Sequence, residues 1–470
     1  MLVGIALMMC CAAMLAVRAD ALPDTLPGAL ARAYQNNPQI NSQRAVVRET
    51  DESVPQALSG YRPTVSAIAQ FAPSYTSSVG PAVTNGAVTN ARTSSTFSQS
   101  TVGLAATQSL YNGFQTANRV RQAESNSSAA REALRVAEQV VLLNAATAYM
   151  DLLRDRALLE VQRRNVEVLQ ELLSQTRERY NFGQVTLTDV AQTEAQLAQG
   201  RVMVLSAEAQ CARSGASYRQ FIGVEAGRLQ PGAPADRLTP PRLIEAVEIA
   251  RIHHPSVGVA MFGIDAAVLQ VKINEGSLYP QVQLGAGVNQ NWDTDPAATA
   301  LRQFNMFVLA QVTVPIYNAG PAGAADTFSS IRLAKETVAQ KRMDLETARD
   351  QVQAAVVTAW GQLEAAKAQI LAAQAQVASS ETALNGVREE ARFGQRTTFD
   401  ILIAQQNLVN ARMALITAQH DRVVASYTLL DAVGYLNLPK LGINTPLYDP
   451  MVHYHQVRDA WIGVRTPDGR

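Results

Sequence analysis

The sequence predicts a mainly α-helical chain that also contributes four membrane-crossing β-strands to a barrel shared between copies. Two stretches with little Pro or Gly are each long enough for a helix of about 100 Å. Four shorter segments alternate apolar and polar residues, and an internal duplication repeats both kinds of element in the same order. Hydrophobic residues make up 47% of the chain but aromatic residues only 6%, which favours closely packed helices over a large globular core.

The duplication is visible as landmarks that recur at a nearly constant offset. Asn37-Pro38 corresponds to His254-Pro255, 217 residues later, and the Phe-Gly-Gln turn beginning at Phe182 recurs 211 residues later at Phe393. Tyr111-Asn112-Gly113 and the second Tyr-Asn sequence at Tyr317 are a third such landmark. We therefore predict a signal peptide (1–21), a first repeat (22–223), a linker (224–240), a second repeat (241–436) and a periplasmic C-terminal tail (437–470).

The strand-like segments show a period of two, so each strand is expected to lie between two different environments. In the second copy these segments are Gln281–Gln290 and Asn305–Val314, and in the first they centre on Val65–Phe71 and Val102–Leu110. About nine or ten residues is the length of a tilted strand that crosses a bilayer. The segments between them, 72–100 and 291–304, are polar and are expected to form loops.

An ordinary β-sandwich with one wet face is the alternative to membrane strands. Aromatic residues at or just beyond the strand ends favour the membrane, because they resemble an interfacial girdle: Tyr61, Phe71, Tyr111, Tyr279, Phe304 and Tyr317. Four strands cannot close a barrel, and lipid does not tolerate unpaired strand edges. Two chains would give eight strands and a bore filled by side chains, whereas three chains would give twelve strands and a lumen. The strand count alone also allows rings of more than three chains.

Each copy is expected to open with a helix, at about 25–58 and 241–275, and to contain two long helices after its strands. From Gln115 to Phe182 there is no Pro and no Gly, and the corresponding stretch runs from about Ala322 to Phe393. Apolar residues recur there at steps of three and four, as in a coiled coil. A soluble rod would explain these helices but not the alternating strands.

The first 21 residues are predicted to be a secretory signal, with an apolar run before Ala19-Asp20-Ala21. A transmembrane anchor is the alternative, although the run is shorter than the roughly 20 residues that span a bilayer. After residue 21 no uninterrupted apolar stretch approaches this length, and Cys211 is the only cysteine. Any membrane span of the mature chain is therefore expected to be β-structure, and no disulfide is expected.

These features together resemble the TolC family of outer-membrane export ducts, over about Thr25 to Gly434. The resemblance implies a trimeric 12-stranded barrel joined to a 12-helix periplasmic tunnel, in the outer membrane of a Gram-negative bacterium. It implies a type I secretion or drug-efflux exit duct that works with a periplasmic adaptor and an inner-membrane ABC or RND-type transporter. A general passive porin or a structural periplasmic coiled coil is the alternative function.

In that family, charged and polar residues close the periplasmic tip of the tunnel. The resemblance assigns the tips, and the contacts with the adaptor, to Phe182, Gly183 and Gln184 and to Phe393, Gly394 and Gln395. Asp400 matches an aspartate that rings the constriction, and Asp189 and Arg396 match a pair that links neighbouring hairpins in the closed state. A second family aspartate is replaced here by Ile403, so weaker cation binding is expected. The alternative is that Asp189 and Asp400 only offset helix dipoles.

Other function classes find little support in the sequence. The 40 basic and 40 acidic residues cancel, whereas a nucleic-acid-binding protein should carry a basic surplus. His253-His254 corresponds to Asn36-Asn37 in the first copy, which indicates a structural corner and not a metal site. We expect no catalytic residues, no cofactor and no bound metal, because no nucleophile motif or phosphate loop is present.

Overall fold

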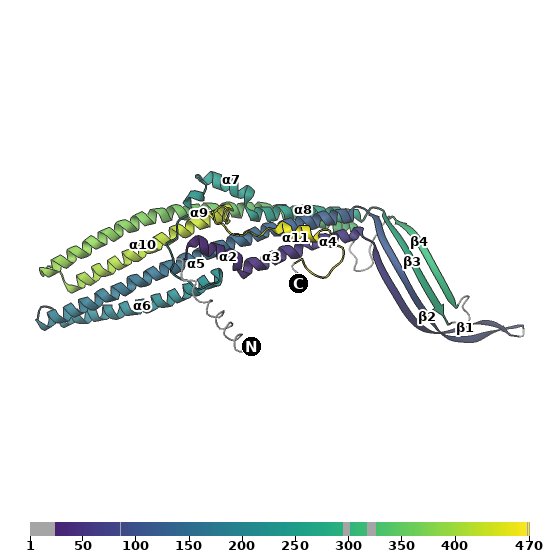
Figure 1. Ribbon diagram of the computed structural model, residues 1–470, viewed down its shortest axis with the longest axis horizontal. Coiled ribbons are helices and arrows are strands. Elements are labelled where there is room, and N and C mark those ends of the chain that lie inside the picture. Colours follow the sequence, from purple (N-terminus) through teal and green to yellow (C-terminus); the bar gives the residue numbers. More distant parts are fainter. Residues whose placement is uncertain (1–23, 85, 295–300, 317–325, 468, 470) are drawn as a thin grey trace, which may run out of the picture. The chain divides into compact units, whose positions relative to one another are not determined.

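The computed structural model describes residues 24–84, 86–294, 301–316, 326–467 and 469, and Figure 1 shows its elements. The chain divides into two compact units. We call them the helical unit (24–46, Arg131–Val259 and Leu345–Asp449) and the sheet unit (Val47–Ala130, Ala260–Asp344 and the residues from Pro450 onward). The predicted signal peptide and Tyr317 lie outside the described residues.

Both halves of the chain run from opening helices through two strands to two long helices, and the first half has one more opening helix than the second. The first half contains α2 (Leu26–Asn36), α3 (Pro38–Asp51), α4 (Ser53–Leu58), β1 (Thr64–Thr84), β2 (Ala87–Asn112), α5 (Gln115–Asn181) and α6 (Leu187–Ile222). The second contains α7 (Leu243–His253), α8 (Pro255–Gly276), β3 (Gln281–Asp293), β4 (Arg302–Thr313), α9 (Thr327–Arg392) and α10 (Thr398–Val433). Short 3-10 turns lie at Ser59–Tyr61 and Asp236–Leu238, and α11 (Pro450–Val457) is the last helix of the described chain.

The four strands form one antiparallel sheet in the order β1-β2-β3-β4 (Figure 1). Their register pairs Ala67 with Leu104, Leu104 with Val288 and Val288 with Met306, so the predicted apolar positions form continuous rows on one face. Thr101, Asn289 and Asn305 belong to the opposite, more polar face. The prediction of four alternating strands is confirmed, and the sheet has one face suited to lipid.

The predicted polar loop at 72–100 is wrong, because β1 and β2 continue through it as a two-stranded ribbon. Residues 73–84 pair only with residues 87–98, before β2 meets β3 at Gln99 and Asp293. Thr and Val are frequent here and favour extended backbone. Asn85-Gly86 is a strong hairpin-turn sequence, and Gly86 has the positive φ, 82°, that such turns require.

The opening helix of each copy is interrupted before its proline, which confirms the corner predicted at Asn36-Asn37 and His253-His254. Asn37 and His254 both have extended backbone, with ψ of 125° and 133°, because each precedes a proline that disfavours the helical conformation. Asn37 Oδ1 accepts a hydrogen bond from the Gln39 amide at 2.8 Å, and His254 Nδ1 accepts one from the Ser256 amide at 3.2 Å. Burial lowers the pKa of His254, as expected for a neutral structural imidazole.

One helical stretch of the described chain, Leu243–Gly276, is apolar and long enough to cross a membrane by length and composition. It comprises α7 and α8 and is broken at His254. Ala246, Ala250 and Val257 are completely buried in a core shared with α9 and α10, so we assign them to helix packing.

The core of the helical unit joins α7 to α9 and α10 around Val356, Leu363, Leu429 and Val433. Asp431 of α10 lies beside this core, and burial raises the pKa of its carboxyl to about 6. Its ionised form is therefore disfavoured in the folded chain. The resulting loss of folding stability is absent below the unfolded pKa of about 4 and is complete above the folded pKa.

We expect Asp431→Asn to stabilise the protein by about 2–3 kcal/mol near neutral pH, because it removes the buried charge. The thermal transition of the variant should exceed that of the unmodified protein at neutral pH and should coincide with it below pH of about 4. Asp265→Asn, at an exposed position on α8, is the matched control. An equal rise at both pH values would contradict the assignment.

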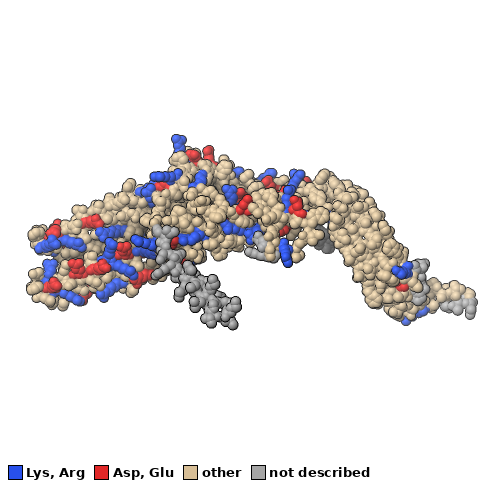
Figure 2. Space-filling model, in the orientation of Figure 1, with Lys and Arg blue, Asp and Glu red and all other residues tan. Residues whose placement is uncertain are grey.

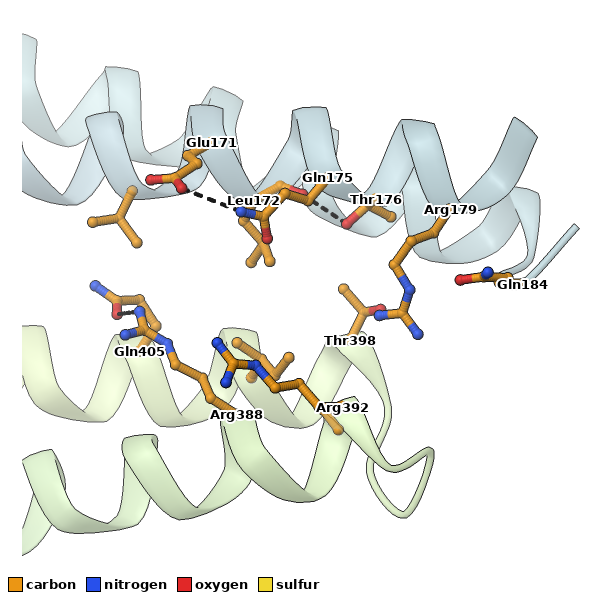
Figure 3. Close-up of a pocket in the computed structure, with 13 residues that line it drawn as sticks. Glu171, Leu172, Gln175, Thr176, Arg179, Gln184, Arg388, Arg392, Thr398 and Gln405 are labelled. Atoms are coloured by element: carbon orange, nitrogen blue, oxygen red, sulfur yellow. Dashed lines mark hydrogen bonds between the residues drawn. The ribbon is translucent and has the colours of Figure 1, made fainter. Parts of the chain in front are cut away.

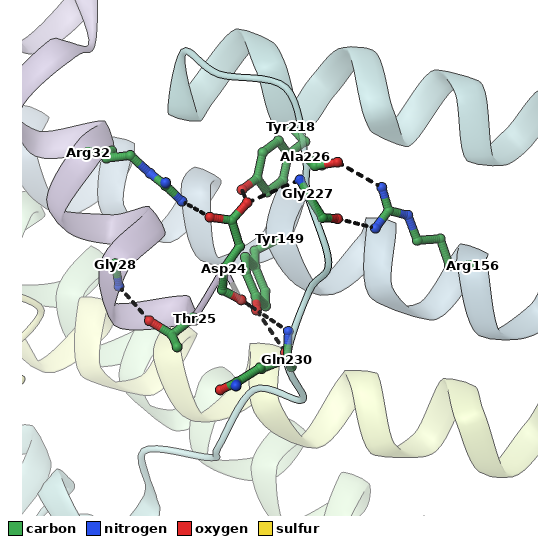
Figure 4. Close-up of polar contacts among 10 residues, drawn as sticks. All are labelled: Asp24, Thr25, Gly28, Arg32, Tyr149, Arg156, Tyr218, Ala226, Gly227 and Gln230. Carbon is green, nitrogen blue, oxygen red and sulfur yellow. Dashed lines mark hydrogen bonds and ion pairs between the residues drawn. The ribbon is translucent and has the colours of Figure 1, made fainter. Parts of the chain in front are cut away.

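Asp24 connects the start of the described chain to the linker (Figure 4). Its carboxylate accepts hydrogen bonds from Arg32 at 2.5 Å, and from Tyr218 and the Gly227 amide at 3.2 Å each. Burial tends to raise the pKa of Asp24, but these donors and the Arg32 charge outweigh burial and hold it below its usual range. Tyr149 adds a hydrogen bond of 2.5 Å to the Asp24 carbonyl. The linker is therefore fixed to the first helices and not free.

Candidate functional site

The first hairpin tip lies between α5 and α6 in the helical unit. Gly183 has a φ of 74°, and its amide donates to the Tyr180 carbonyl at 2.8 Å, while the Gln184 amide donates to Arg179 at 2.9 Å. This pattern is the left-handed glycine turn that ends many helices. The ring of Phe182 is 80% exposed, so it contributes to the surface of the tip and not to its core.

The second tip, between α9 and α10, has the same construction. Gly394 has a φ of 75°, its amide donates to Ala391 at 3.2 Å, and the Gln395 amide donates to Glu390 at 2.9 Å. Phe393 is 79% exposed. Each chain therefore presents two similar turns, each with an exposed aromatic side chain.

Asp189 and Asp400 occupy equivalent positions in the first turns of α6 and α10. Each closes a capping box with a threonine three residues earlier. Asp189 Oδ2 accepts from the Thr186 amide at 2.8 Å, and Asp400 Oδ2 accepts from the Thr397 amide at 2.9 Å. The hydrogen bonds from Thr397 and the nearby Arg396 charge lower the pKa of Asp400, so it is ionised near neutral pH.

Arg396 lies in the second tip, where its Nε donates to Glu390 Oε2 at 2.8 Å. Its side chain remains 51% exposed. The single chain thus brings Arg396 close to Glu390 and Asp400, and, among the described residues, no ion pair joins it to Asp189. An Asp189–Arg396 contact in a closed state would have to form between neighbouring hairpins.

A polar cleft of about 660 Å³ lies between the ends of the two hairpins, and sequence reasoning did not identify it. Arg179, Arg388 and Arg392 extend into this cleft, and Glu171 lines it from α5 (Figure 3). Arg388 Nη2 donates to Gln405 at 3.5 Å, and Arg392 pairs with Glu389 at 2.8 Å. The only sequence signal is basic residues in the last helical turns, which helix dipoles alone explain. Figure 2 shows that side chains of both charges gather over these hairpins.

Within the chain, the α5–α6 hairpin packs on the α9–α10 hairpin through a small apolar cluster and a polar contact beside it. Leu169 and Leu173 of α5 contact Leu197 of α6 and Leu402 of α10. Gln405 of α10 donates to Asn165 of α5 at 3.2 Å. Among the described residues, no group of three or more His, Cys, Asp or Glu side chains is arranged to hold a metal ion.

Comparisons with known proteins agree with this architecture. The model of the outer membrane efflux protein family matches residues 29–224 and 246–435. The chain is 39% identical over 451 residues to outer membrane efflux protein BepC of Brucella suis, covering 96% of this chain and 94% of that protein. It is 26% identical to outer membrane protein TolC of Vibrio cholerae, over 68% of this chain and 72% of that one.

Solved structures give the same fold. The CmeC outer membrane channel of Campylobacter jejuni superposes with a TM-score of 0.74 at 15% identity, over 92% of this chain and 89% of that one. The four strands and the two long helical hairpins are thus features of a known channel fold.

Proposed function

Because this chain belongs to the outer membrane efflux protein family, it is an outer-membrane exit duct, and we propose that it is a homotrimer gated at its two hairpin tips. It lies in the outer membrane and has a large periplasmic part. The four-stranded sheet carries the proposal of a shared barrel, because β1 and β4 are each paired on only one side. Three chains would supply about twelve strands and a lumen.

The helices support the same ring. Within one chain, α10 lies along a face of α5 that carries Ala157, Glu160, Val161 and Arg164. The corresponding positions 211 residues later, on α9, are Ala368, Leu371, Ala372 and Ala375, and all four are exposed and uncharged. Leu371 of α9 is 69% exposed and Leu205 of α6 is 65% exposed. We assign this face of α9 to α6 of the next copy, so that head-to-tail contacts close the ring; the mass of the detergent-solubilised assembly tests the number of copies.

The gate follows from the charges at the tips. Arg396 is exposed and Asp189 partly exposed, and the two lie on different hairpins and carry opposite charges. Contacts between them in neighbouring hairpins would hold the tips together, and Asp400 would place one carboxylate per copy at the constriction. Opening would then require Asp189 and Arg396 to separate.

We expect Asp189→Asn and Arg396→Ala to raise the single-channel conductance of the purified duct in planar bilayers several-fold. Asparagine keeps an oxygen that can accept the Thr186 amide but removes the charge. Thr186→Ala is the matched control, since it removes half of the capping box and leaves the charge. If neither charge variant changed the single-channel conductance, or if Thr186→Ala raised it equally, Asp189 would act only as a helix cap.

The exposed tips are also the surface that we assign to the partners. A periplasmic adaptor would contact Phe182, Gly183 and Gln184 and the equivalent Phe393, Gly394 and Gln395, whose aromatic rings are exposed. An inner-membrane ABC or RND-type transporter would supply the energy, and the duct itself would be passive. Crosslinking from positions 182 and 393 in cells, followed by identification of the captured proteins, tests this assignment.

A further inference from the structure

The C-terminal segment after α11 exposes apolar side chains in the sheet unit. Trp461 is 69% exposed, Ile462 97% and Val464 101%, so Ile462 and Val464 make almost no contact with the rest of the chain. Short apolar stretches with this exposure commonly mark a surface that another phase or molecule covers. Of these three side chains, Trp461 has one close neighbour, the guanidinium of Arg62.

The segment is held in place by α11, which is fixed to α3 and α5. His453 is 7% exposed and its Nδ1 lies 3.4 Å from Oδ2 of the completely buried Asp51, which Ser127 also contacts. Tyr454 donates to Glu124 at 3.3 Å, and Arg458 lies 3.7 Å from the same carboxylate. The tail therefore leaves α11 from a defined position.

Arg62 connects this segment to the end of the sheet. Its Nη1 donates to the Ala460 carbonyl at 2.8 Å, and its Cζ lies 4.6 Å from the centre of the Trp461 ring. Arg62 is two residues before β1, at the end of the sheet where β2 ends and β3 begins. The exposed rings of Tyr61, Phe114 and Tyr279 lie at the same end of the sheet, next to the apolar face of the strands.

We propose that residues 461–464 form a lipid-contacting foot, which inserts into the headgroup layer of the phospholipid leaflet at this edge of the barrel. This inference rests on the membrane position of the sheet. Trp beside Arg is suited to that layer, because the indole is amphipathic and the guanidinium can reach phosphate groups. Ile462 and Val464 would enter the acyl boundary, where their exposure no longer opposes the hydrophobic effect.

The test uses the intrinsic fluorescence of single tryptophans, because the chain has only Trp292, Trp360 and Trp461. The full chain with Trp292→Phe and Trp360→Phe is reconstituted in phosphatidylcholine vesicles with brominated acyl chains. Trp461 should lose roughly half of its emission when the bromines are near the headgroup and less when they are near the chain ends, as expected for shallow insertion. Emission that bromine does not quench and aqueous acrylamide does would overturn the proposal.

Two further single-tryptophan proteins separate the failure of this inference from the failure of the barrel. Trp292 belongs to the apolar face of β3 and should be quenched, whereas Trp360 in α9 of the helical unit should not. Quenching of Trp292 without quenching of Trp461 would overturn the foot alone. A blue-shifted Trp461 that neither bromine nor acrylamide quenches would show burial against a second copy, and would also overturn it.

Discussion

Val308→Arg is expected to abolish most of the assembled duct, because it places a charge on the face of the sheet that we assign to lipid. Val308 pairs with Ala286 in the middle of β4, and its side chain is 70% exposed in the single chain. Arginine facing lipid near the bilayer midplane costs about 2–4 kcal/mol per strand position. A ring of three copies would bear this cost three times. The amount of the proposed trimer, recovered as a heat-resistant species from outer-membrane extracts, measures the effect.

Asn305→Arg is the matched control for this experiment. Asn305 lies on the same strand, pairs with Asn289 and belongs to the opposite, polar face. An arginine there should reach the lumen and leave the assembly largely intact. If Asn305→Arg were the more damaging change, the two faces of the sheet would have been assigned the wrong way round.

Gly113→Ala is expected to have the second largest effect. Gly113 lies between β2 and α5 with a φ of 64°, a conformation that side chains disfavour. A Cβ atom at this position would lie 2.1 Å from the carbonyl oxygen of Gly276, so the backbone would have to move. Strain and overlap together should exceed about 4 kcal/mol, the range in which single substitutions become exceptional. We expect almost no heat-resistant trimer from this variant.

Gly263→Ala provides the comparison, because Gly263 is in the middle of α8 and an added Cβ would meet no atom within 4 Å. Alanine there should stabilise the helix by about 0.5–1 kcal/mol. Normal assembly of Gly113→Ala would mean that the β2–α5 corner can relax, and the close approach to Gly276 would then have no structural importance.

The strands and long helices were predictable because each follows from a periodic pattern that extends over many residues. The alternation in Gln281–Gln290 predicts the same face that the register of β3 shows, and the Phe-Gly-Gln turns predict the ends of α5 and α9. Polarity alone gave the wrong answer for 72–100. Hydroxyl and β-branched residues can pair as strands in water, and Asn85-Gly86 was the signal that should have outweighed their polarity.

The remaining features depend on residues far apart in the sequence. Nothing near Asp24 predicts that Tyr218 and Gly227 donate to it, and nothing near Arg62 predicts a contact with Trp461. The arginine-lined cleft likewise requires α5 and α9 to approach each other. The capping boxes account for Asp189 and Asp400 through neighbouring residues alone. Their proposed role at the constriction is therefore tested by the conductance experiment and not by the local geometry.

The two-stranded ribbon is a surface separate from the four-stranded part of the sheet. Residues 73–84 and 87–98 form strand pairs only with each other, Ser98 at the base of the ribbon also bonds to Thr294, and Arg92 is the one charged residue among them. The ribbon lies at the end of the sheet opposite to the β2–α5 corner, so in the proposed duct it would be the portion that antibodies reach without crossing the envelope. Because the ribbon does not take part in pairing with β3, substitutions in it should leave the shape of the conduit unchanged.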